Sequence, residues 1–364
     1  MGMVGGGIGA FIGNVHRMAA GLDGKIDLVA GAFSSDPKRS IESGEALGLD
    51  PSRVYGSFQE MIDKEKSLPA DKRIHLVSIV TPNHMHFEPA VMALQAGFHV
   101  ICDKPMTFDL EQAYILREEV KKSGNIFALT HNYTGYPMVK QARHVVQNGS
   151  IGKVRKVVVE YPQGWLSTLL EASEQKQAAW RTDPTKSGIA GAMGDIGTHA
   201  ENLAEYITGL KITELCADIS TIVLGRQLDD DGSVLLRFDN GARGILHASQ
   251  ICAGEENNLS IRVYCERGGI EWKQMEPNSL VVRYIDEATK IFRTGGFGAC
   301  TAAQVATRIP AGHPEGYLEA FANIYNNVAT CIAARLEGKE VDLIYHDYPT
   351  VEDGVRGMQF IYKV

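Results

Sequence analysis

The first third of the chain alternates short apolar runs with amphipathic segments. Runs with the length of buried strands lie at residues 1–4, 26–33, 74–80, 99–102 and 126–130. Segments with helical spacing lie between or after them, at about 11–20, 42–47, 58–64, 86–97 and 110–123. This alternation has the spacing of right-handed crossover units, which predicts a parallel sheet and an α/β fold.

The pattern changes after about residue 131. Later apolar positions follow period two and predict strands at residues 154–161, 214–223, 233–238, 242–249, 259–265 and 279–285. Helices are expected in this half at residues 137–147, 198–208 and 317–336. Asp239-Asn240-Gly241 is a strong hairpin signal between two of the strands. We therefore expect an antiparallel sheet here, and two domains, residues 1–131 and 132–364.

Length, composition and charge limit the class of protein. A chain of 364 residues, 44% apolar and 22% charged, is typical of a globular protein with more than one core. Its net charge of −8, without clustered Lys and Arg, argues against a nucleic-acid partner. No apolar run approaches the roughly 20 residues of a membrane helix, and no export signal opens the chain. We expect a cytoplasmic protein with no membrane partner.

Cysteine usage and the chain ends add two expectations. Six cysteines are scattered without C-x-x-C spacing, as is typical of reduced, mostly buried thiols. We therefore expect neither a disulfide framework nor a metal site. Only Met1 to Val4 precede the first glycine turn, which suggests that an N-terminal piece of the first strand is missing, and Val364 need not be the native end.

The stretch at residues 4–16 has the form of a dinucleotide-binding turn. Gly5, Gly7 and Ala10 fit the pattern Gly-x-Gly-x-x-Gly/Ala, and Phe11 and Ile12 begin the helix that follows. Glycine permits a tight turn and a close approach of the backbone to a pyrophosphate, which the amides of the helix N-terminus then hold. The alternative is a flexible glycine loop near a chain end, which would predict no strand-and-helix pattern downstream.

The end of the second strand leaves the choice of cofactor open. Dinucleotide folds place an acid here to bind the ribose hydroxyls, and Ser34 occupies that place, followed by Ser35. Asp36 precedes a proline and is typical of a turn residue. Lys38 and Arg39 suit either a 2′-phosphate or the solvated face of a helix. NAD(H) and NADP(H) both remain candidates, with NAD(H) favoured.

Lys104 is the first candidate for chemistry. It follows a strand of the predicted parallel sheet, at the edge where ligands of such sheets bind. Pro105 restricts the lysine backbone to extended geometry. A lysine held there can bind a substrate hydroxyl and favour loss of its proton. The alternative is a surface lysine with a chance proline.

Asp195 and His199 form the second candidate group. They lie four residues apart, so on a helix they share a face. A histidine suits removal of an alcohol proton, and an aspartate can orient its ring. The alternative is a helix-capping aspartate and a core histidine.

These motifs, in this order, resemble the glucose-fructose oxidoreductase, inositol dehydrogenase and MocA family (Gfo/Idh/MocA). The resemblance covers nearly the whole chain and rests on Gly5-x-Gly7-x-x-Ala10, Thr81-Pro82-Asn83-His84-Met85-His86, Asp103-Lys104-Pro105 and Asp195-x-x-x-His199. The family usually has Glu-Lys-Pro, so Asp103 is a conservative departure. The proline after the lysine is often cis in this family, which we expect for Pro105.

The resemblance implies the fold and the site. It implies an N-terminal Rossmann dinucleotide-binding domain and a C-terminal α+β domain, whose open, mainly antiparallel sheet often forms homodimers or homotetramers. The catalytic residues would be Lys104, Asp195 and His199. Cofactor binding would involve Gly5, Gly7, Ala10, Phe11, Ile12, Ser34, Ser35, Thr81, Asn83, His86, Asp103 and Lys104. Substrate binding would involve Lys104, Asn132, Tyr133, Tyr136, Trp165, Asp195, His199 and His313.

Several of these residues have a structural alternative. His86 also suits the start of a helix, Tyr133 and Tyr136 suit packing between domains, Trp165 suits a core, and the loop of His313 suits helix capping.

The leading hypothesis is an NAD(P)-dependent dehydrogenase acting on a carbohydrate or cyclitol. A first alternative is an NAD-dependent glycosidase that oxidises a sugar transiently and eliminates its aglycone, with the same residues. A second alternative is a non-catalytic dinucleotide-binding regulator, against which the joint presence of Lys104, Asp195 and His199 argues. The sugar, the oxidised carbon and the physiological direction stay open.

Overall fold

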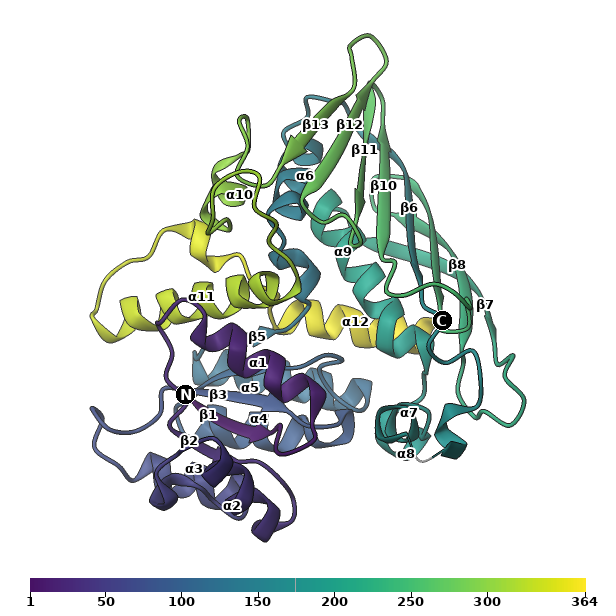
Figure 1. Cartoon of the computed structure of the whole chain (residues 1–364). Helices are drawn as coiled ribbons and strands as arrows, with labels where there is room; N and C mark the ends of the chain where they lie inside the picture. Colours follow the sequence, from purple (N-terminus) through teal and green to yellow (C-terminus); the bar gives the residue numbers. More distant parts are fainter. Residues whose placement is uncertain (174) are drawn as a thin grey trace. The chain divides into compact units, whose positions relative to one another are not determined.

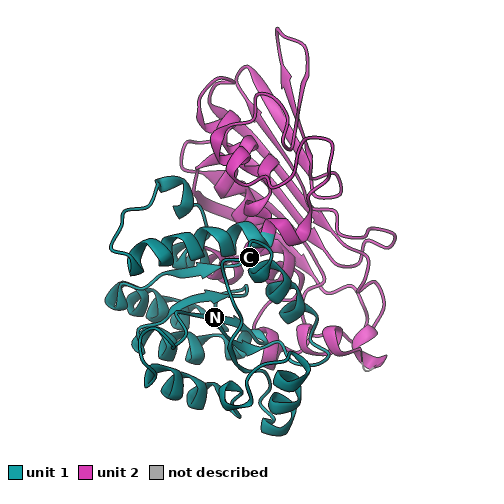
Figure 2. Cartoon of the chain, turned by 60° about the vertical axis from the view of Figure 1, so that its left-hand side comes forward, with its two compact units in different colours: residues 1–130, 321–355 teal, residues 131–320, 356–364 magenta. Residues whose placement is uncertain are grey.

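The structure, a computed structural model, describes residues 1–173 and 175–364 (Figure 1). It divides into two compact units, coloured separately in Figure 2. Unit 1 comprises residues 1–130 and 321–355, and unit 2 comprises residues 131–320 and 356–364. The first break along the chain lies beside the boundary expected near residue 131, and residues 321–355 then return to unit 1.

Unit 1 is built on a five-stranded parallel sheet. The strands are β1 (Gly2–Gly5), β2 (Ala30–Ala32), β3 (Leu76–Val80), β4 (His99–Cys102) and β5 (Phe127–Leu129), in the order β2-β1-β3-β4-β5. Every neighbouring pair is parallel. All five residues of β3 are buried, as a strand covered on both faces requires. The predicted parallel sheet is confirmed, although the strand expected at 26–33 is limited to Ala30–Ala32.

The helices between these strands are α1 (Phe11–Gly21), α2 (Pro37–Ala46), α3 (Phe58–Lys66), α4 (Phe87–Gln95) and α5 (Leu110–Ser123), with short 3₁₀ turns η1 (Pro51–Arg53) and η2 (Asn83–Met85). Three of the five helices begin at a residue whose side chain caps them. The side chains of Asp36, Ser57 and Asp109 accept main-chain N–H groups at the starts of α2, α3 and α5. Gly124 ends α5 in the left-handed conformation, at φ +66°.

A late segment of the chain completes unit 1. Helix α11 (Tyr317–Leu336) enters this unit at Phe321 and lies beside α1 (Figure 1). The Tyr325 hydroxyl lies 2.7 Å from His16 Nδ1 and 2.8 Å from Ser78 Oγ, so α11 supplies a polar partner to α1 and β3. The turn η6 (Leu343–His346) and the start of α12 (Val351–Lys363) follow. The sequence pattern did not predict α12.

Unit 2 contains an eight-stranded mixed sheet. Its strands are β6 (Val154–Pro162), β7 (Ile212–Ser220), β8 (Asp231–Phe238), β9 (Arg243–Ser249), β10 (Ser260–Cys265), β11 (Gly268–Lys273), β12 (Ser279–Tyr284) and β13 (Lys290–Arg293), in the order β13-β12-β11-β10-β6-β9-β8-β7. The β6–β9 pair is parallel, and the other pairs are antiparallel. The predicted mainly antiparallel sheet is confirmed, and β11 and β13 are additions to it.

Two helices cover one face of this sheet. They are α6 (Pro137–Gln147) and α9 (Thr198–Thr208), both at their predicted bounds (Figure 1). Along β8, buried residues alternate with exposed ones, and Leu235 on the other face is 61% exposed. Shorter elements complete the unit: η3 (Asn132–Gly135), η4 (Leu170–Ser173), α7 (Lys176–Arg181), α8 (Pro184–Ser187), the π-helical turn η5 (Met193–Gly197) and α10 (Thr301–Val305).

The predicted hairpin at residues 239–241 joins β8 to β9. Gly241 has φ +86°, a conformation that glycine adopts without strain, and its N–H donates to Phe238 O over 2.9 Å. Asn240 Oδ1 accepts the N–H of Ala242 over 2.8 Å. The turn therefore sets the antiparallel register of β8 and β9.

Within the described ranges 1–173 and 175–364, the helices all fall short of the combined length and apolarity that crossing a bilayer demands.

A buried carboxylate fixes the end of α9 in unit 2. Glu205, only 5% exposed at its side chain, pairs with Arg356 of α12 and accepts from the N–H of Ile212 over 2.8 Å. Arg356 also donates to the main-chain oxygen of Ile212 over 3.0 Å. Lys211 lies 2.8 Å from the same carboxylate. These contacts tie α9, β7 and the last helix together.

Replacement of Arg356 by Met is expected to lower the free energy of unfolding by about 2 kcal/mol, because a buried carboxylate loses one charged partner and keeps Lys211. Urea denaturation measures this change. The control is Arg237→Met, which breaks a pair with Glu214 whose side chains are 58% and 67% exposed, and which should change stability little. Equal effects of the two substitutions would contradict the structural role of Arg356.

Candidate functional site

The turn after β1 requires glycine at both motif positions. Gly5 has φ +82°, and a Cβ there would lie 2.8 Å from Thr81 Cγ2. A Cβ on Gly7 would lie 2.7 Å from Ser43 Oγ and 2.8 Å from Phe33 O. Ala10 is the residue before α1, and its side chain makes no capping hydrogen bond. The turn is thus too closely packed for side chains at Gly5 and Gly7, and its role in holding a pyrophosphate stays a prediction.

Gly13 is a further required glycine that the sequence analysis did not assign. A Cβ on Gly13 would lie only 2.3 Å from the Cα of Gly6, so α1 and the turn touch through their backbones. The signal in the sequence was a glycine three residues after Ala10, inside a helix where glycine is otherwise unfavourable.

Apolar side chains stand exposed beside this turn. Phe11 is 61% exposed and Ile8 is 52% exposed, while Ile12 is half-buried. Large apolar groups exposed at a helix N-terminus are suited to lying against a flat ligand. The assignment of Phe11 and Ile12 to cofactor binding stays a prediction.

The end of β2 shows how Asp36 is used. Its Oδ1 accepts from the N–H groups of Lys38 and Arg39 at 3.0 and 3.5 Å, so Asp36 caps α2. Ser34 Oγ accepts the N–H of Asp36 over 3.2 Å, and Ser35 is exposed. Arg39 Nη2 donates to Ile8 O over 3.1 Å, which brings a guanidinium onto the glycine turn.

The Lys104 turn is fixed by the carboxylate that precedes it. Asp103 Oδ1 accepts from the Lys104 N–H at 2.9 Å and from Thr130 Oγ1 at 2.8 Å. The Lys104–Pro105 peptide bond is cis, as expected. Asp103 therefore links the ends of β4 and β5 and holds the backbone of the lysine.

His86 braces the same region from inside. It is fully buried, with Nδ1 2.8 Å from Pro105 O and Nε2 2.8 Å from Thr81 O. Burial lowers the pKa of His86. Asn83, in η2, is also buried, and Thr81 Oγ1 donates to Met85 O over 3.0 Å. His86 thus connects the turn after β3 with the Lys104–Pro105 turn.

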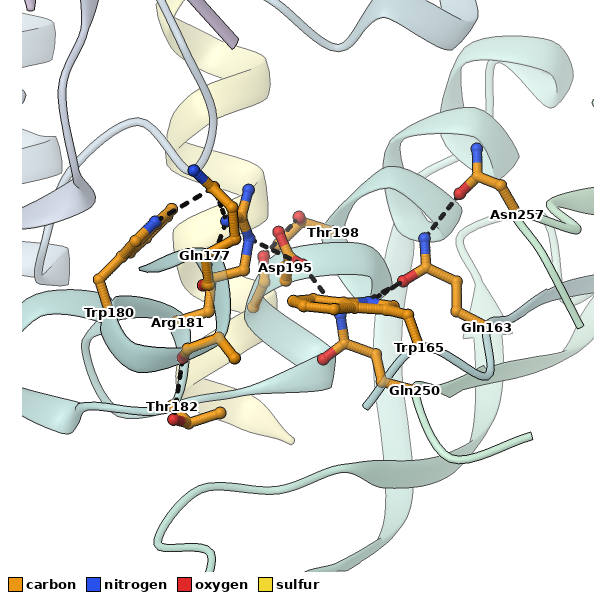
Figure 3. A network of polar contacts seen from close by, with 12 residues as sticks. Gln163, Trp165, Gln177, Trp180, Arg181, Thr182, Asp195, Thr198, Gln250 and Asn257 are labelled. Carbon is orange, nitrogen blue, oxygen red and sulfur yellow. Dashed lines mark hydrogen bonds and ion pairs between the residues drawn. The ribbon is translucent and has the colours of Figure 1, made fainter. Parts of the chain in front are cut away.

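In unit 2, Asp195 belongs to the π-helical turn η5 and His199 to the first turn of α9. Asp195 Oδ2 accepts from Gln250 Nε2 over 2.9 Å and lies 3.4 Å from Arg181 Nε (Figure 3). His199 is 7% exposed, and its Nδ1 lies 3.4 Å from Nδ1 of His131. The carboxylate therefore faces two donors one turn before the histidine.

Aromatic residues surround the His199 ring. The ring centroid of Tyr133 lies 4.9 Å from that of His199, and the Tyr133 hydroxyl bonds to that of Tyr161. Asn257 joins both phenols: its Oδ1 accepts from Tyr161 over 2.7 Å, and its Nδ2 donates to Tyr133 over 3.2 Å. Burial raises the pKa of both tyrosines, so both stay protonated.

The remaining predicted substrate residues have varied positions. Tyr136 is buried, stacks on Tyr133 and tilts against Trp272, as a packing residue does. Asn132 is buried in η3. Trp165 is half-buried, and its Nε1 donates to Gln163 Oε1 over 3.0 Å. His313 is exposed, with Nδ1 3.1 Å from Pro310 O in its own loop.

Some of the predicted residues thus form one group in each unit. Unit 1 brings together Thr81, His86, Asp103 and Lys104. Unit 2 brings together Tyr133 and His199, to which the structure adds Tyr161, a residue that the sequence did not predict for the site. Sequence analysis missed Gln163, Arg181, Gln250 and Asn257, because single polar residues at these separations form no local motif. Among residues 1–173 and 175–364, His, Cys, Asp and Glu side chains form no group of three or more suited to a metal ion.

Comparison with known proteins decides the family. Residues 1–131 match the oxidoreductase family with an NAD-binding Rossmann fold, and residues 139–271 match the GFO/IDH/MocA C-terminal domain. The chain belongs to the Gfo/Idh/MocA oxidoreductase family. This Gfo/Idh/MocA protein is 34% identical over 364 residues to an uncharacterised oxidoreductase of Bacillus subtilis, covering 99% of this chain and 92% of that protein.

Named relatives and solved structures are also similar. Levoglucosan dehydrogenase of Pseudarthrobacter phenanthrenivorans is 28% identical over 312 residues, which are 79% of this chain and 76% of that protein. An inositol dehydrogenase homolog from Azotobacter vinelandii, complexed with NAD+, is 34% identical, with a TM-score of 0.93 and coverage of 100% and 93%. An oxidoreductase from Sinorhizobium meliloti is 48% identical, with a TM-score of 0.89 and coverage of 100% and 95%.

The close contact between Gly13 and Gly6 gives a test of the cofactor turn in this Gfo/Idh/MocA protein. Gly13→Ala is expected to weaken NADH binding by at least about tenfold, because α1 must move away from the phosphate-binding turn to admit a methyl group. Titration of NADH fluorescence measures the affinity. Gly21→Ala is the matched control, since a Cβ at that end of α1 meets nothing within 4 Å. Unchanged affinity in both variants would contradict the role assigned to Gly13.

Proposed function

We propose that this protein is an NAD(P)-dependent dehydrogenase that oxidises or reduces a hydroxyl carbon of a sugar, a sugar derivative or an inositol. The observation that carries the proposal lies in unit 1. The neighbouring strands β1, β3 and β4 end in the glycine turn, in the Thr81–His86 segment and in the Asp103–Lys104 turn. Since parallel strands end at one edge of their sheet, the lysine lies on the dinucleotide-binding edge.

The residues of the glycine turn fit a dinucleotide. Gly5, Gly7 and the start of α1 would hold its pyrophosphate, because a side chain at Gly7 would fill the cradle. When bound, the nicotinamide supplies the hydride acceptor or donor. The protein then has to bind the hydroxyl, stabilise negative charge on its oxygen and move one proton.

Three side chains suit these tasks. Lys104 would bind the substrate oxygen and stabilise the negative charge that develops on it. His199 would take the hydroxyl proton at Nε2, because its Nδ1 faces His131. Asp195 would orient His199 and favour its protonated form. In the reducing direction, His199, oriented by Asp195, would return the proton to the oxygen.

The class of substrate is supported by the relatives. The protein is similar to a levoglucosan dehydrogenase and to a myo-inositol 2-dehydrogenase of Thermotoga maritima, 27% identical over 216 residues, or 58% of each chain. The Azotobacter vinelandii homolog was also solved with NADH and myo-inositol. Gln163, Asn257 and the tyrosines of unit 2 offer the amides and hydroxyls that bind polyols.

Lys104→Met is expected to lower kcat by roughly 10²- to 10⁴-fold, since it removes the charge that stabilises the developing alkoxide. The affinity for NADH should change far less. A screen of sugars and inositols, read as NADH formation, identifies the substrate for this measurement. The control is Lys121→Met, which removes the same charge from the exposed last turn of α5.

The outcomes of that screen separate the possible activities. Retention of turnover in Lys104→Met would contradict the role of the lysine. Release of an aglycone without net NADH would identify a redox-cycling glycosidase instead of a dehydrogenase. Failure of every sugar and inositol to reduce the cofactor would favour a regulator.

For the cofactor, we propose that NAD(H) is favoured over NADP(H), because the similar Azotobacter vinelandii structures carry NAD+ or NADH. The Asp36 carboxylate is committed to the cap of α2, and two arginines lie on the glycine turn: Arg39 donates to Ile8 O and Arg17 donates to Gly6 O. Arg39 follows the end of β2, so it is the cation that would meet a 2′-phosphate. Arg39→Met is expected to lower the affinity for NADPH by roughly tenfold if this guanidinium meets a 2′-phosphate, with little effect on NADH. Fluorescence titration of wild type and variant with NADH and with NADPH measures the difference in affinity. A larger loss of affinity for NADH than for NADPH would contradict the contact between Arg39 and a 2′-phosphate.

A further inference from the structure

A chain of hydrogen bonds in unit 2 leads from an indole to the Asp195 carboxylate (Figure 3). Trp165 Nε1 donates to Gln163 Oε1 over 3.0 Å, and Gln250 Nε2 donates to the same oxygen over 3.3 Å. Gln250 Nε2 also donates to Asp195 Oδ2 over 2.9 Å. Three side chains thus stand in series behind the carboxylate.

The orientation of each amide in this series of hydrogen bonds follows from the indole of Trp165. An indole N–H can only donate, so the oxygen of the Gln163 amide must face Trp165. Gln163 Nε2 then points to Asn257 Oδ1, at 2.6 Å. Gln163 Oε1 in turn requires a donor from Gln250, so the Gln250 amide turns its nitrogen to both Gln163 and Asp195. The reversed Gln250 amide would set an oxygen against two other oxygens.

The backbone holds these side chains in place. Gln163 N–H donates to Ser249 O over 2.7 Å, and Leu166 N–H donates to Gln250 O over 3.1 Å. These bonds extend the pairing of β6 and β9 beyond the ends of the strands. Gln250 is 3% exposed, so its amide has little access to solvent and depends on protein partners.

A second donor approaches Asp195 from α7. Arg181 Nε lies 3.4 Å from Asp195 Oδ2, and the guanidinium stacks on Trp180, 4.3 Å from the ring centroid. Arg181 Nη1 also donates to Gln177 Oε1 over 2.5 Å. Because one carboxylate oxygen faces an amide donor and a guanidinium, the arrangement fits an ionised Asp195 and opposes a protonated one.

We propose that Trp165 is a positioning residue that acts through Gln163 and Gln250 to hold Asp195 as an ionised, oriented acceptor. This differs from the expectation that Trp165 binds the substrate directly. It rests on the proposed function, in which Asp195 orients His199. Trp165 then affects the chemical step through the carboxylate and does so without requiring contact with a sugar.

Trp165→Phe separates the two roles, because it keeps an aromatic ring and removes only the indole donor. We expect kcat to fall by roughly tenfold and KM to stay within about threefold, since a loosened Asp195 misorients the proton acceptor. A ring that stacks on the substrate would instead give a change in KM with kcat retained, and that result would overturn the proposal.

A double-mutant cycle tests whether Trp165 acts through Asp195. In an Asp195→Asn background, Trp165→Phe is expected to change kcat by less than about twofold, because the carboxylate that it positions is absent. A tenfold loss in both backgrounds would overturn the proposal. Trp272→Phe is the matched control, since it also removes an indole donor, one that serves the main-chain oxygen of Pro277 over 3.1 Å and no side chain of this network.

The same four proteins give a readout that does not depend on activity. Trp165→Phe should lower the urea midpoint more in the wild-type background than in Asp195→Asn, because bonds to a carboxylate are stronger than bonds to an amide. Equal shifts in the two backgrounds would overturn the inference. If Trp165→Phe does not fold, Gln250→Met replaces it in both cycles.

Failure of the proposed function gives results that differ from those expected if only the role of Trp165 is wrong. If wild type turns over no sugar or inositol, that function is wrong, and the urea cycle alone decides the inference. If wild type is active and Asp195→Asn is impaired while the kinetic cycle is additive, only the role of Trp165 is wrong.

Discussion

The parallel pairing of β1, β3 and β4 is the constraint on which the cofactor unit depends. Parallel strands need a crossover after each strand, so each one ends at the same edge and is followed by a turn. Those turns hold the glycine cradle, the Thr81–His86 segment and Lys104. His86, with one ring nitrogen near Thr81 O and the other near Pro105 O, connects two of them. The backbone of Lys104 is therefore held both by Asp103 in its own turn and by residues at the neighbouring strand ends.

Unit 2 positions its chemical groups in a different way. Asp195 and His199 lie at the start of α9, and their surroundings come from separate strands and a short helix. Gln250 follows β9 and Arg181 ends α7, yet both reach the same carboxylate oxygen. A mixed sheet covered by helices on one face supplies such residues from many directions. As a result, no single helix or strand determines the positions of the side chains around Asp195.

The sequence predicted more of the fold than of the site. Periodicity gave the bounds of α5, α6 and α9, and the glycines that end α5 and α9, Gly124 and Gly209, adopt the left-handed conformation that stops a helix. It missed β11, which opens with Gly268-Gly269, and β13, whose four residues are mostly exposed. Among the candidate site residues, local motifs pointed to Lys104, because the proline and the strand end are neighbours in sequence. Gln250 contacts Asp195 across 55 residues, a separation at which one polar residue carries no pattern.

The return of residues 321–355 to unit 1 has a consequence for biosynthesis. His16 and Ser78 both use the hydroxyl of Tyr325, which is synthesised 309 and 247 residues after them. The nucleotide-binding unit is therefore complete only after residues 131–320 of the other unit have been made. A nascent chain arrested before α11 would expose apolar surface on α1, and vectorial folding from the N-terminus alone does not yield the finished Rossmann unit.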